Sequence, residues 1–229
     1  MKVVIVMPAY NEEKTIKKSL QSLKEGFPRA NVVVVNDGSS DKTEEIALAE
    51  GAFVASHIIN RGLGATLATG IKSAMRKNAD IIVTFDADLQ HSGRDIKNLI
   101  EPIQKKRANA VIGSRFLRKE DLEMMPPVTK FGNWFLTGFT NLLARTKVTD
   151  SQSGLRAFDK KAAKAISIVC DRYDVSSEIV YELGRYGMKI EEVPIKALYD
   201  ERSKRKGTNV REGVKIMHGI LLKRLWLRK

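Results

Sequence analysis

The sequence predicts an α/β fold with a mostly parallel β-sheet that is covered by helices on both faces. Short apolar runs rich in β-branched residues alternate with helical patterns along the first half of the chain. The runs are continuously apolar, which is typical of strands buried on both sides. Strands and helices that alternate in this way usually form a doubly wound sheet, whose ligand crevice lies at the carboxyl ends of the strands.

Five apolar runs are expected to form the strands of this sheet. Each has the length and the β-branched content of a buried strand. The runs are KVVIVMP at residues 2–8, NVVVVND at 31–37, AFVASH at 52–57, DIIVTFD at 80–86 and AVIGS at 110–114.

Four stretches with apolar residues three and four positions apart are expected to be helices. In the first stretch, Ile16, Leu20 and Leu23 lie on one face of the helix. Serines before a stretch suit helix caps, and glycines after it suit helix stops. The four stretches run from Ile16 to a stop at Gly26, from the caps Ser39 and Ser40 to Gly51, over residues 64–78, and onward from Ser92.

Composition excludes several classes of protein. With 229 residues, 43% hydrophobic and 29% charged, the chain is expected to fold as one globular domain with at most a small appendage. The single cysteine, Cys170, excludes an internal disulfide, and the three histidines are not in a zinc-ligand spacing. No apolar stretch reaches the roughly 18 residues of a membrane span, and no signal peptide is recognised, so a cytoplasmic protein is expected.

Positive charge is concentrated at the C-terminus. The formal charge is +13, and residues 202–229 hold ten Lys or Arg and one acid, Glu212, for a net +9. Such a cluster suits nucleic acid, an anionic membrane surface or a phosphorylated substrate. No helix-turn-helix, RNP or zinc-finger signature accompanies it, and nucleic acid is therefore not an expected partner.

The stretch IIVTFDADLQH at residues 81–91 points to a metal site. Asp86, Asp88 and Gln90 alternate after an apolar run, and alternation in an extended chain would place all three side chains on one face. Turn chemistry, which explains Ser39, Ser40 and Asp41 well, does not require two carboxylates on one face. Hard oxygen ligands without His or Cys suit Mg²⁺ or Mn²⁺, ions that usually complete their shell with substrate phosphates.

A glycine-rich phosphate loop is not found. The stretch NRGLGATLATG contains Gly62, Gly64 and Gly70, but Leu67 stands where GxGxxG needs its third glycine, and GxxxxGK[ST] is not matched. A tight turn into a helix is the expected role of these glycines. A P-loop kinase and a nicotinamide dehydrogenase are therefore disfavoured.

Six motifs in register resemble the family 2 glycosyltransferases, in particular the dolichol-phosphate mannosyltransferase and polyprenyl-phosphate glycosyltransferase branch. The resemblance covers residues 2–198, through VIVMPAYNEE, VVVVNDGSSDKT, NRGLGATLATGI, FDADLQH, GSRF and DSQSGLRAF. It implies a GT-A (Rossmann-like) fold and inverting transfer of a hexose from a nucleotide sugar to a dolichyl or polyprenyl phosphate. GDP-mannose is the favoured donor. UDP-glucose and UDP-N-acetylglucosamine stay open, because the choice of base and sugar depends on loop geometry.

The resemblance also implies roles for individual residues on the donor side. Residues expected to hold the nucleoside are Pro8, Tyr10, Glu12, Val35 and Asp37. Residues expected along the diphosphate and sugar are Asp86, Ala87 and Asp88, with Asp88 and Gln90 as the main ligands of Mg²⁺ or Mn²⁺ and Asp86 nearby. Arg202 and Lys204 are expected to close over the diphosphate, with Lys206 as the alternative to Lys204.

The resemblance assigns two further residues to the acceptor side, and a third residue, Asp150, is a separate candidate for catalysis. Arg115 of GSRF and Lys130 are expected to contact the acceptor phosphate, because a lipid phosphate that approaches an anionic donor needs cationic partners. Both residues have an alternative interpretation. Arg115 could be a surface arginine in an ion pair, and Lys130 could be an ordinary surface lysine. Asp150 of DSQSG is expected to be a base or orienting group, or the cap of the following turn.

Two amphipathic segments are expected to reach a membrane. Residues 130–145 place Phe131, Trp134, Phe135, Phe139 and Leu142 on one helix, and the C-terminal segment carries apolar stripes between basic residues. We expect residues 1–200 to be the GT-A catalytic domain and 201–229 a basic loop and amphipathic helix, attached peripherally to the cytoplasmic face. The alternative is that these helices are core or a contact between subunits.

Two other functions compete with this interpretation. One is a soluble family 2 glycosyltransferase that uses UDP-glucose or UDP-N-acetylglucosamine with a sugar or protein acceptor. The other is a non-catalytic nucleotide- or membrane-binding protein, which the intact pair Asp86 and Asp88 disfavours.

Overall fold

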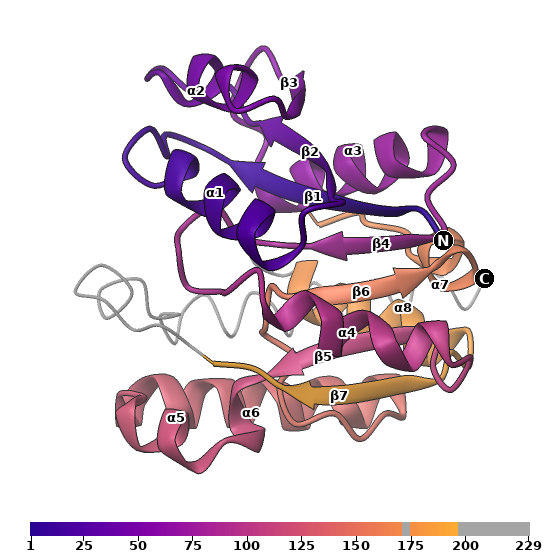
Figure 1. Cartoon of the computed structure of the whole chain (residues 1–229). Coiled ribbons are helices and arrows are strands. Elements are labelled where there is room, and N and C mark those ends of the chain that lie inside the picture. The colour runs from indigo at the N-terminus through magenta and orange to yellow at the C-terminus, as the bar shows by residue number, and fades with distance from the viewer. Residues whose placement is uncertain (171–174, 197–229) are drawn as a thin grey trace.

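The structure, a computed structural model, describes residues 1–170 and 175–196 and contains one sheet flanked by helices (Figure 1). The strands of the described part are β1 Val3–Ala9, β2 Asn31–Asn36, β3 Phe53–Ser56, β4 Ile81–Thr84, β5 Ala110–Ser114, β6 Arg156–Asp159 and β7 Ile190–Pro194. Their order in the sheet is β3-β2-β1-β4-β6-β5-β7. All pairs are parallel except those of β6, which runs antiparallel to β4 and β5. The predicted α/β fold with a mostly parallel sheet is thus confirmed.

The helices lie between the strands in the chain. They are α1 Ile16–Gly26, α2 Thr43–Ala49, α3 Leu63–Arg76, α4 Asp95–Gln104, α5 Lys119–Met124, α6 Pro127–Ala144, α7 Lys160–Ala165 and α8 Val175–Arg185, with a short 3₁₀ turn at Arg115–Leu117. All four helices expected in the first half are present. The segment expected to carry the aromatic stripe is also helical, within α6.

Alternating side chains of the central strand build the core on both faces of the sheet. On β1, Ile5 and Met7 are buried with the apolar stripes of α1 and α4 on one face. Val4 and Val6 face the other way and pack with α3, α7 and α8 (Figure 1). Each of these side chains is completely buried, and full burial of such a side chain contributes about 1.5–3 kcal/mol.

The antiparallel strand β6 brings a second loop to the carboxyl edge of the sheet. Arg156, its first residue, pairs with Thr84 of β4 and with Ile112 of β5. The segment 145–155 that precedes β6 therefore lies at the same edge as the segments that follow β4 and β5. A βα crossover alone would have placed it at the opposite edge.

Gly26 ends α1 for a different reason from the one expected. Its φ is not in the left-handed region, so it is not a C-terminal stop that needs positive φ. A Cβ on Gly26 would lie 2.2 Å from the carbonyl carbon of Gly93, so the glycine allows α1 to approach the segment before α4.

The start of α2 also differs from the expectation. The carboxylate of Asp41, and not Ser39 or Ser40, accepts the Thr43 N–H, at 3.0 Å. Asp41 thus stabilises the turn before α2, whose N-cap residue is Lys42.

The described residues contain no helix with the length and apolarity required to cross a bilayer. The expected basic loop and amphipathic C-terminal helix at 201–229 lie outside the described residues. The division of the chain at residue 200 stays a prediction.

We predict that Gly26→Ala destabilises the fold, because the new methyl group would meet the backbone of Gly93. Overpacking of this kind costs about 1–3 kcal/mol, measurable as a lower midpoint in urea unfolding. Gly132→Ala on α6 is the matched control, because no atom outside its own stretch of helix lies within 4 Å of the position of its Cβ. Equal midpoints for the two variants would contradict the close packing of α1.

Candidate functional site

The carboxyl ends of β1, β2, β4 and β5 lie at one edge of the sheet (Figure 1). The segments that follow these strands carry Tyr10, Asp37, Asp86 and Arg115. Segments at such an edge are where doubly wound folds bind their ligands. The fold therefore collects most of the predicted site residues at one edge.

The segment after β1 is fixed to the segment after β2 by hydrogen bonds. The Asn11 N–H donates to Ser39 Oγ at 3.0 Å, and the Ser40 N–H donates to Asn11 Oδ1 at 2.9 Å. The Glu12 N–H donates to Thr43 Oγ1 at 2.8 Å. These bonds leave the Tyr10 side chain 47% exposed at the edge, between two mutually anchored segments.

Pro8 and Glu12 flank Tyr10 and are both partly exposed. Pro8 lies within β1 opposite Val35. The Glu12 carboxylate accepts a hydrogen bond from Thr15 Oγ1 at 2.6 Å. The structure thus brings three of the residues expected at the nucleoside together at the end of β1.

Asp37 is buried and held by the segment between β3 and α3. Its Oδ1 lies 2.6 Å from His57 Nδ1 and accepts the Arg61 N–H at 3.0 Å, while its Oδ2 accepts the Gly62 N–H at 2.8 Å. On the other side of the ring, His57 Nε2 lies 2.9 Å from Thr69 Oγ1 on α3. Gly62 has φ 91° and directly precedes α3. Gly62 makes the expected tight turn into a helix, and this turn also orients Asp37. The same role is wrong for Gly64 and Gly70, which lie inside α3.

Two of the residues expected on the donor side have buried side chains. Val35 is fully buried beneath α3, with its Cγ2 3.2 Å from the position a Cβ on Gly70 would take. Ala87 is 3% exposed in the core beside α1, and its carbonyl oxygen accepts a hydrogen bond from Ser19 Oγ at 2.8 Å. Neither methyl-bearing side chain can reach a ligand at the edge, because helices cover both.

The extended conformation expected for residues 86–90 is also wrong. β4 ends at Thr84, the chain turns at Ala87 and Asp88, and Leu89 has φ 66°. The Gln90 N–H donates to Asp88 Oδ1 at 3.1 Å within this turn. Asp86, Asp88 and Gln90 therefore belong to a compact turn, where the alternation of an extended strand does not apply.

Asp86 interacts with a buried histidine. Its Oδ2 lies 3.4 Å from His91 Nε2, and the His91 ring is 4% exposed and packs edge-on against Phe85. Burial alone would raise the pKa of Asp86, but the contact with His91 and the charges of Arg156 and Arg115 outweigh it and lower the pKa. The Asp86 side chain is 32% exposed, so an ionised carboxylate is presented at the edge.

Arg115 and Asp150 form a bidentate ion pair. Arg115 Nε donates to Asp150 Oδ2 at 2.7 Å and Nη2 donates to Oδ1 at 2.9 Å. Asp150 is completely buried, while the Arg115 side chain is 14% exposed. Burial would raise the pKa of Asp150, but the charge and hydrogen bonds of Arg115 lower it below its ordinary value. The Gln152 N–H also donates to Asp150 Oδ1 at 3.3 Å, so the carboxylate caps the following turn as well.

Arg156 is a buried positive charge that interacts electrostatically with both carboxylates. The residue is 1% exposed, and its Nη2 donates to the carbonyl oxygen of Ser151 at 2.8 Å. Burial lowers its pKa to about 10, against the opposing charges of Asp150 and Asp86. Asp86, Arg156, Asp150 and Arg115 thus form a group of two negative and two positive charges, which we call the edge charge cluster.

The turn after β4 fits a hard divalent cation that shares its shell with a ligand. Within residues 1–170 and 175–196, no three His, Cys, Asp or Glu side chains gather in a geometry suited to a metal ion. The turn offers two carboxylates and the amide of Gln90, and the lowered pKa keeps Asp86 ionised. Two carboxylates without a complete protein cage suit Mg²⁺ or Mn²⁺ bound together with substrate phosphates.

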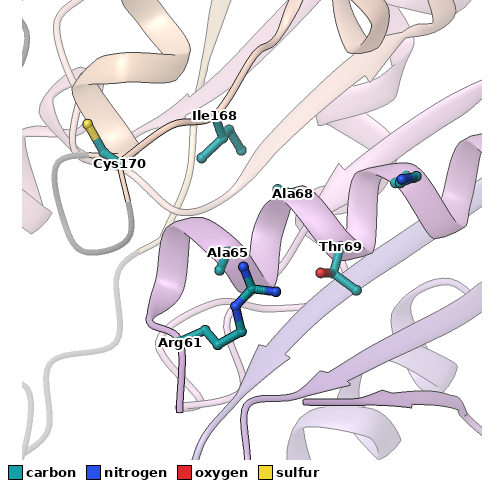
Figure 2. A pocket seen from close by; sticks show the side chains of 7 residues that line it. Arg61, Ala65, Ala68, Thr69, Ile168 and Cys170 are labelled. Atoms are coloured by element: carbon teal, nitrogen blue, oxygen red, sulfur yellow. The ribbon is translucent and has the colours of Figure 1, made fainter. Parts of the chain in front are cut away.

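A pocket of about 260 Å³ lies along α3 (Figure 2). Its lining combines the basic side chains of Arg61 and Lys72 with Ala65, Ala68 and Thr69 of α3 and with Ile168 and Cys170. Thr69 links the pocket to His57 and through it to Asp37. The pocket does not include the turn after β4.

The remaining predicted residues are placed less completely. Lys130 is exposed in the first turn of α6. Arg202, Lys204 and the alternative Lys206 lie outside the described residues.

Sequence reasoning missed His57, His91 and Arg156. His91 directly follows Gln90, and Arg156 lies within DSQSGLRAF, so both were inside quoted motifs without a role. His57 lies 20 residues from Asp37 in the chain, and no local pattern connects the two.

Comparison with known proteins identifies the fold and its relatives. Residues 4–167 match the family described as Glycosyl transferase family 2. An uncharacterised protein of Methanocaldococcus jannaschii is 47% identical, over 98% of this chain and 93% of its own. The UDP-N-acetylglucosamine–dolichyl-phosphate N-acetylglucosaminyltransferase of Methanococcus voltae is 38% identical, over 96% and 95%. The undecaprenyl-phosphate mannosyltransferase of Micrococcus luteus is 29% identical, over 93% and 91%.

A solved structure supports the fold. Glucosyl-3-phosphoglycerate synthase from Mycobacterium tuberculosis, in complex with phosphoglyceric acid, has a TM-score of 0.73 at 20% identity, over 96% of this chain and 77% of that one. The same enzyme has been solved with Mn²⁺ and UDP, with a TM-score of 0.66 at 18% identity, over 96% and 77%. The predicted GT-A fold is confirmed.

We predict that Asp150→Asn strongly destabilises the protein at pH 7, by about 3–5 kcal/mol, because it leaves Arg115 without its charged partner. Folding lowers the pKa of Asp150. The ionised carboxylate therefore contributes its full share to the free energy of unfolding above the unfolded pKa of about 3.9, and this share is lost as the pH falls through the folded pKa. The stability difference between wild type and variant should therefore shrink below about pH 4. Urea unfolding at several pH values measures it.

Asp80→Asn is the matched control, because Asp80 forms an exposed ion pair with Lys160 at 2.8 Å. Exposed pairs contribute about 0–1 kcal/mol, so this variant should stay close to wild type at pH 7. A cost for Asp150→Asn as small as that of the control would contradict the structural role of the pair.

Proposed function

The chain belongs to glycosyl transferase family 2, and we propose that it transfers a sugar from a nucleoside diphosphate sugar to the phosphate of a dolichyl or polyprenyl lipid. The observation that carries this proposal is the position of Asp86 and Arg115. These residues follow β4 and β5, and β6 alone separates these strands in the sheet. Strand spacing puts the two strand ends roughly 10 Å apart, a suitable separation for a donor diphosphate and an acceptor phosphate.

The donor proposed first is UDP-N-acetylglucosamine. The relative from Methanococcus voltae, named for that donor and for dolichyl phosphate, matches this chain at 38% identity over nearly its whole length. GDP-mannose, the donor favoured from the sequence, is the second candidate. It is supported by the Micrococcus luteus relative, which is named as a mannosyltransferase and is 29% identical.

The donor side is proposed to consist of the segments after β1, β2 and β4. Tyr10 is exposed, and the Asp37 N–H donates to the carbonyl oxygen of Ala9, the residue before Tyr10, at 2.9 Å. We assign the nucleoside to this region together with Pro8 and Glu12. Asp86, Asp88 and Gln90 would hold Mg²⁺ or Mn²⁺ against the diphosphate. When bound, such an ion offsets the negative charge that develops on a departing nucleoside diphosphate.

The acceptor side is proposed to centre on Arg115. A phosphate monoester loses its second proton near pH 6, so the acceptor oxygen is already a nucleophile at neutral pH. A strong base is therefore unnecessary, and Asp150 is a poor candidate for one, because it is completely buried and its pKa is lowered. We assign Asp150 the orienting role instead. It holds the guanidinium of Arg115 in one position, and Lys130 is the second cation proposed for the acceptor.

A lipid acceptor requires contact with a membrane, and α6 offers a suitable face. Phe131 and Trp134 are each 66% exposed, Phe135 is 48% exposed and Leu142 is 74% exposed. Phe139 instead packs against the buried cluster between α6 and α8. Exposed aromatic and aliphatic side chains on one helix are typical of attachment at a bilayer interface. We propose peripheral attachment to the cytoplasmic face through α6, with the basic residues 201–229 as a second contact.

We predict that purified protein transfers N-acetylglucosamine from UDP-N-acetylglucosamine to dolichyl phosphate in the presence of Mn²⁺, more efficiently than mannose from GDP-mannose. Asp88→Ala should lower the rate by about 10²–10³-fold, the usual cost of losing charge stabilisation at a leaving group. Chelation should inactivate the enzyme, and added Mn²⁺ should restore it. Mass spectrometry of the organic extract identifies the product.

Asp80→Asn serves as the control variant in this assay, because its exposed ion pair lies at the start of β4, away from the turn. It should transfer at the wild-type rate. A product made only with soluble sugar or protein acceptors would overturn the lipid acceptor while keeping the enzyme class. Full activity in the absence of any divalent ion would overturn the role of the turn.

We predict that replacing Phe131 and Trp134 together by serine reduces binding to anionic liposomes. Burial of one such side chain contributes about 1.5–3 kcal/mol, so binding should fall by at least tenfold in a sedimentation assay. Tyr186→Ser is the control, because Tyr186 is an aromatic residue that is 51% exposed and follows α8, so it is not part of α6. Unchanged sedimentation of the double variant would remove α6 from this role and leave residues 201–229 as the proposed attachment.

A further inference from the structure

We propose that Gly154 and His91 are positioning residues that fix the carboxylate of Asp86 in the geometry needed to bind a divalent ion and a nucleoside diphosphate. The inference rests on the proposed function of the turn after β4. It concerns two residues that have no assigned role: one in the loop before β6 and one directly after the turn.

Gly154 leaves a space that the Asp86 carboxylate fills. A Cβ on Gly154 would lie 2.0 Å from Asp86 Oδ2, 2.7 Å from Cγ and 2.8 Å from Oδ1. The backbone of Gly154 is not in the left-handed region, so its conformation does not require glycine. The missing side chain is thus explained by the carboxylate that occupies its place.

The backbone around Gly154 is held on both sides, so it cannot easily move away from a new methyl group. The carbonyl oxygen of Gly154 accepts a hydrogen bond from Thr84 Oγ1 at 2.6 Å. The next carbonyl, of the fully buried Leu155, accepts the Gly113 N–H at 2.9 Å. Any side chain at position 154 would therefore displace the Asp86 carboxylate, which is the end of a side chain and the part most easily moved.

His91 holds the same carboxylate from another direction. Its Nε2 lies 3.4 Å from Asp86 Oδ2, at ion-pair distance. Its Nδ1 is buried and has no hydrogen-bond partner within the described part of the chain. The ring is packed edge-on against Phe85, with centroids 6.0 Å apart. The contact at His91 Nε2 thus orients Asp86. The packing of the imidazole ring against Phe85 holds Nε2 in place.

These contacts separate the roles of the two ring nitrogens in a way that substitution can test. A glutamine at position 91 places its amide nitrogen near the position of Nε2, while an asparagine places it near the position of Nδ1. His91→Gln should therefore keep the contact with Asp86, and His91→Asn should lose it. Both variants remove the ring, so a purely structural role would weaken both alike.

The test is calorimetric titration of UDP, with and without Mn²⁺, into the full-length protein. Loss of a residue that orients a metal ligand usually costs about 10–100-fold in affinity, and this is the expected loss of Mn²⁺-dependent UDP affinity for Gly154→Ala. In an Asp86→Ala background the same substitution should cost nothing further, because the group it displaces is gone. Gly132→Ala, which adds a methyl group in open space, should match wild type.

Four results decide the inference. The inference is supported if Gly154→Ala lowers Mn²⁺-dependent UDP affinity only when Asp86 is present, and if His91→Gln binds UDP with Mn²⁺ more tightly than His91→Asn does. Wild-type affinity in Gly154→Ala, or an equal loss in both backgrounds, would overturn it while leaving the proposed function in place. Equal weakening by the two His91 variants would overturn the role of His91. Wild-type protein that binds UDP without any effect of Mn²⁺ would instead overturn the proposed role of the turn, and the inference with it.

Discussion

The buried guanidinium of Arg156 is the constraint on which the functional edge of this protein depends. A charge that is 1% exposed is tolerated only when opposite charges and hydrogen bonds compensate for its lost hydration. Arg156 receives this compensation from Asp86 and Asp150 and from the carbonyl oxygen of Ser151. The two carboxylates therefore serve the stability of the fold as well as the chemistry proposed at its edge.

The position of Arg156 follows from the single antiparallel strand. Because β6 runs against its neighbours, its first residue lies beside the last residue of β4 and near the end of β5. The carboxylate after β4 and the ion pair after β5 thus share one buried charge. A rearrangement on the donor side would change the field at Arg115, and the edge charge cluster offers a physical connection between the two halves of the proposed reaction.

The sequence predicted the parts of the fold that have strong local signals. The runs that became β1 to β5 are continuously apolar, and four helical stripes between them were recognisable. β6 and β7 were missed because RAFD begins with a buried arginine and IEEVP carries two acids, so neither resembles a buried strand. The environment of Arg156 comes from residues distant in the chain, and no local pattern reveals it.

The candidate site was predicted in its composition more than in its geometry. The carboxylates of Asp86 and Asp88 and the cation of Arg115 lie at the predicted edge. The alternation of residues 86–90 failed, because a left-handed residue, Leu89, turns the chain where an extended strand was expected. The burial of the Val35 side chain beneath α3 was not expected, because residue type alone does not show which face of a strand a helix covers.

The central claim is that donor and acceptor phosphates bind at neighbouring strand ends, across the edge charge cluster. Hydrogen–deuterium exchange tests it most directly, because it reports each segment separately. UDP with Mn²⁺ should slow amide exchange at residues 10–13, 37–41 and 85–91, and a short-chain polyprenyl phosphate should slow exchange at residues 113–118. Protection by UDP confined to the pocket along α3, or protection by the polyprenyl phosphate that leaves residues 113–118 unchanged, would contradict the account.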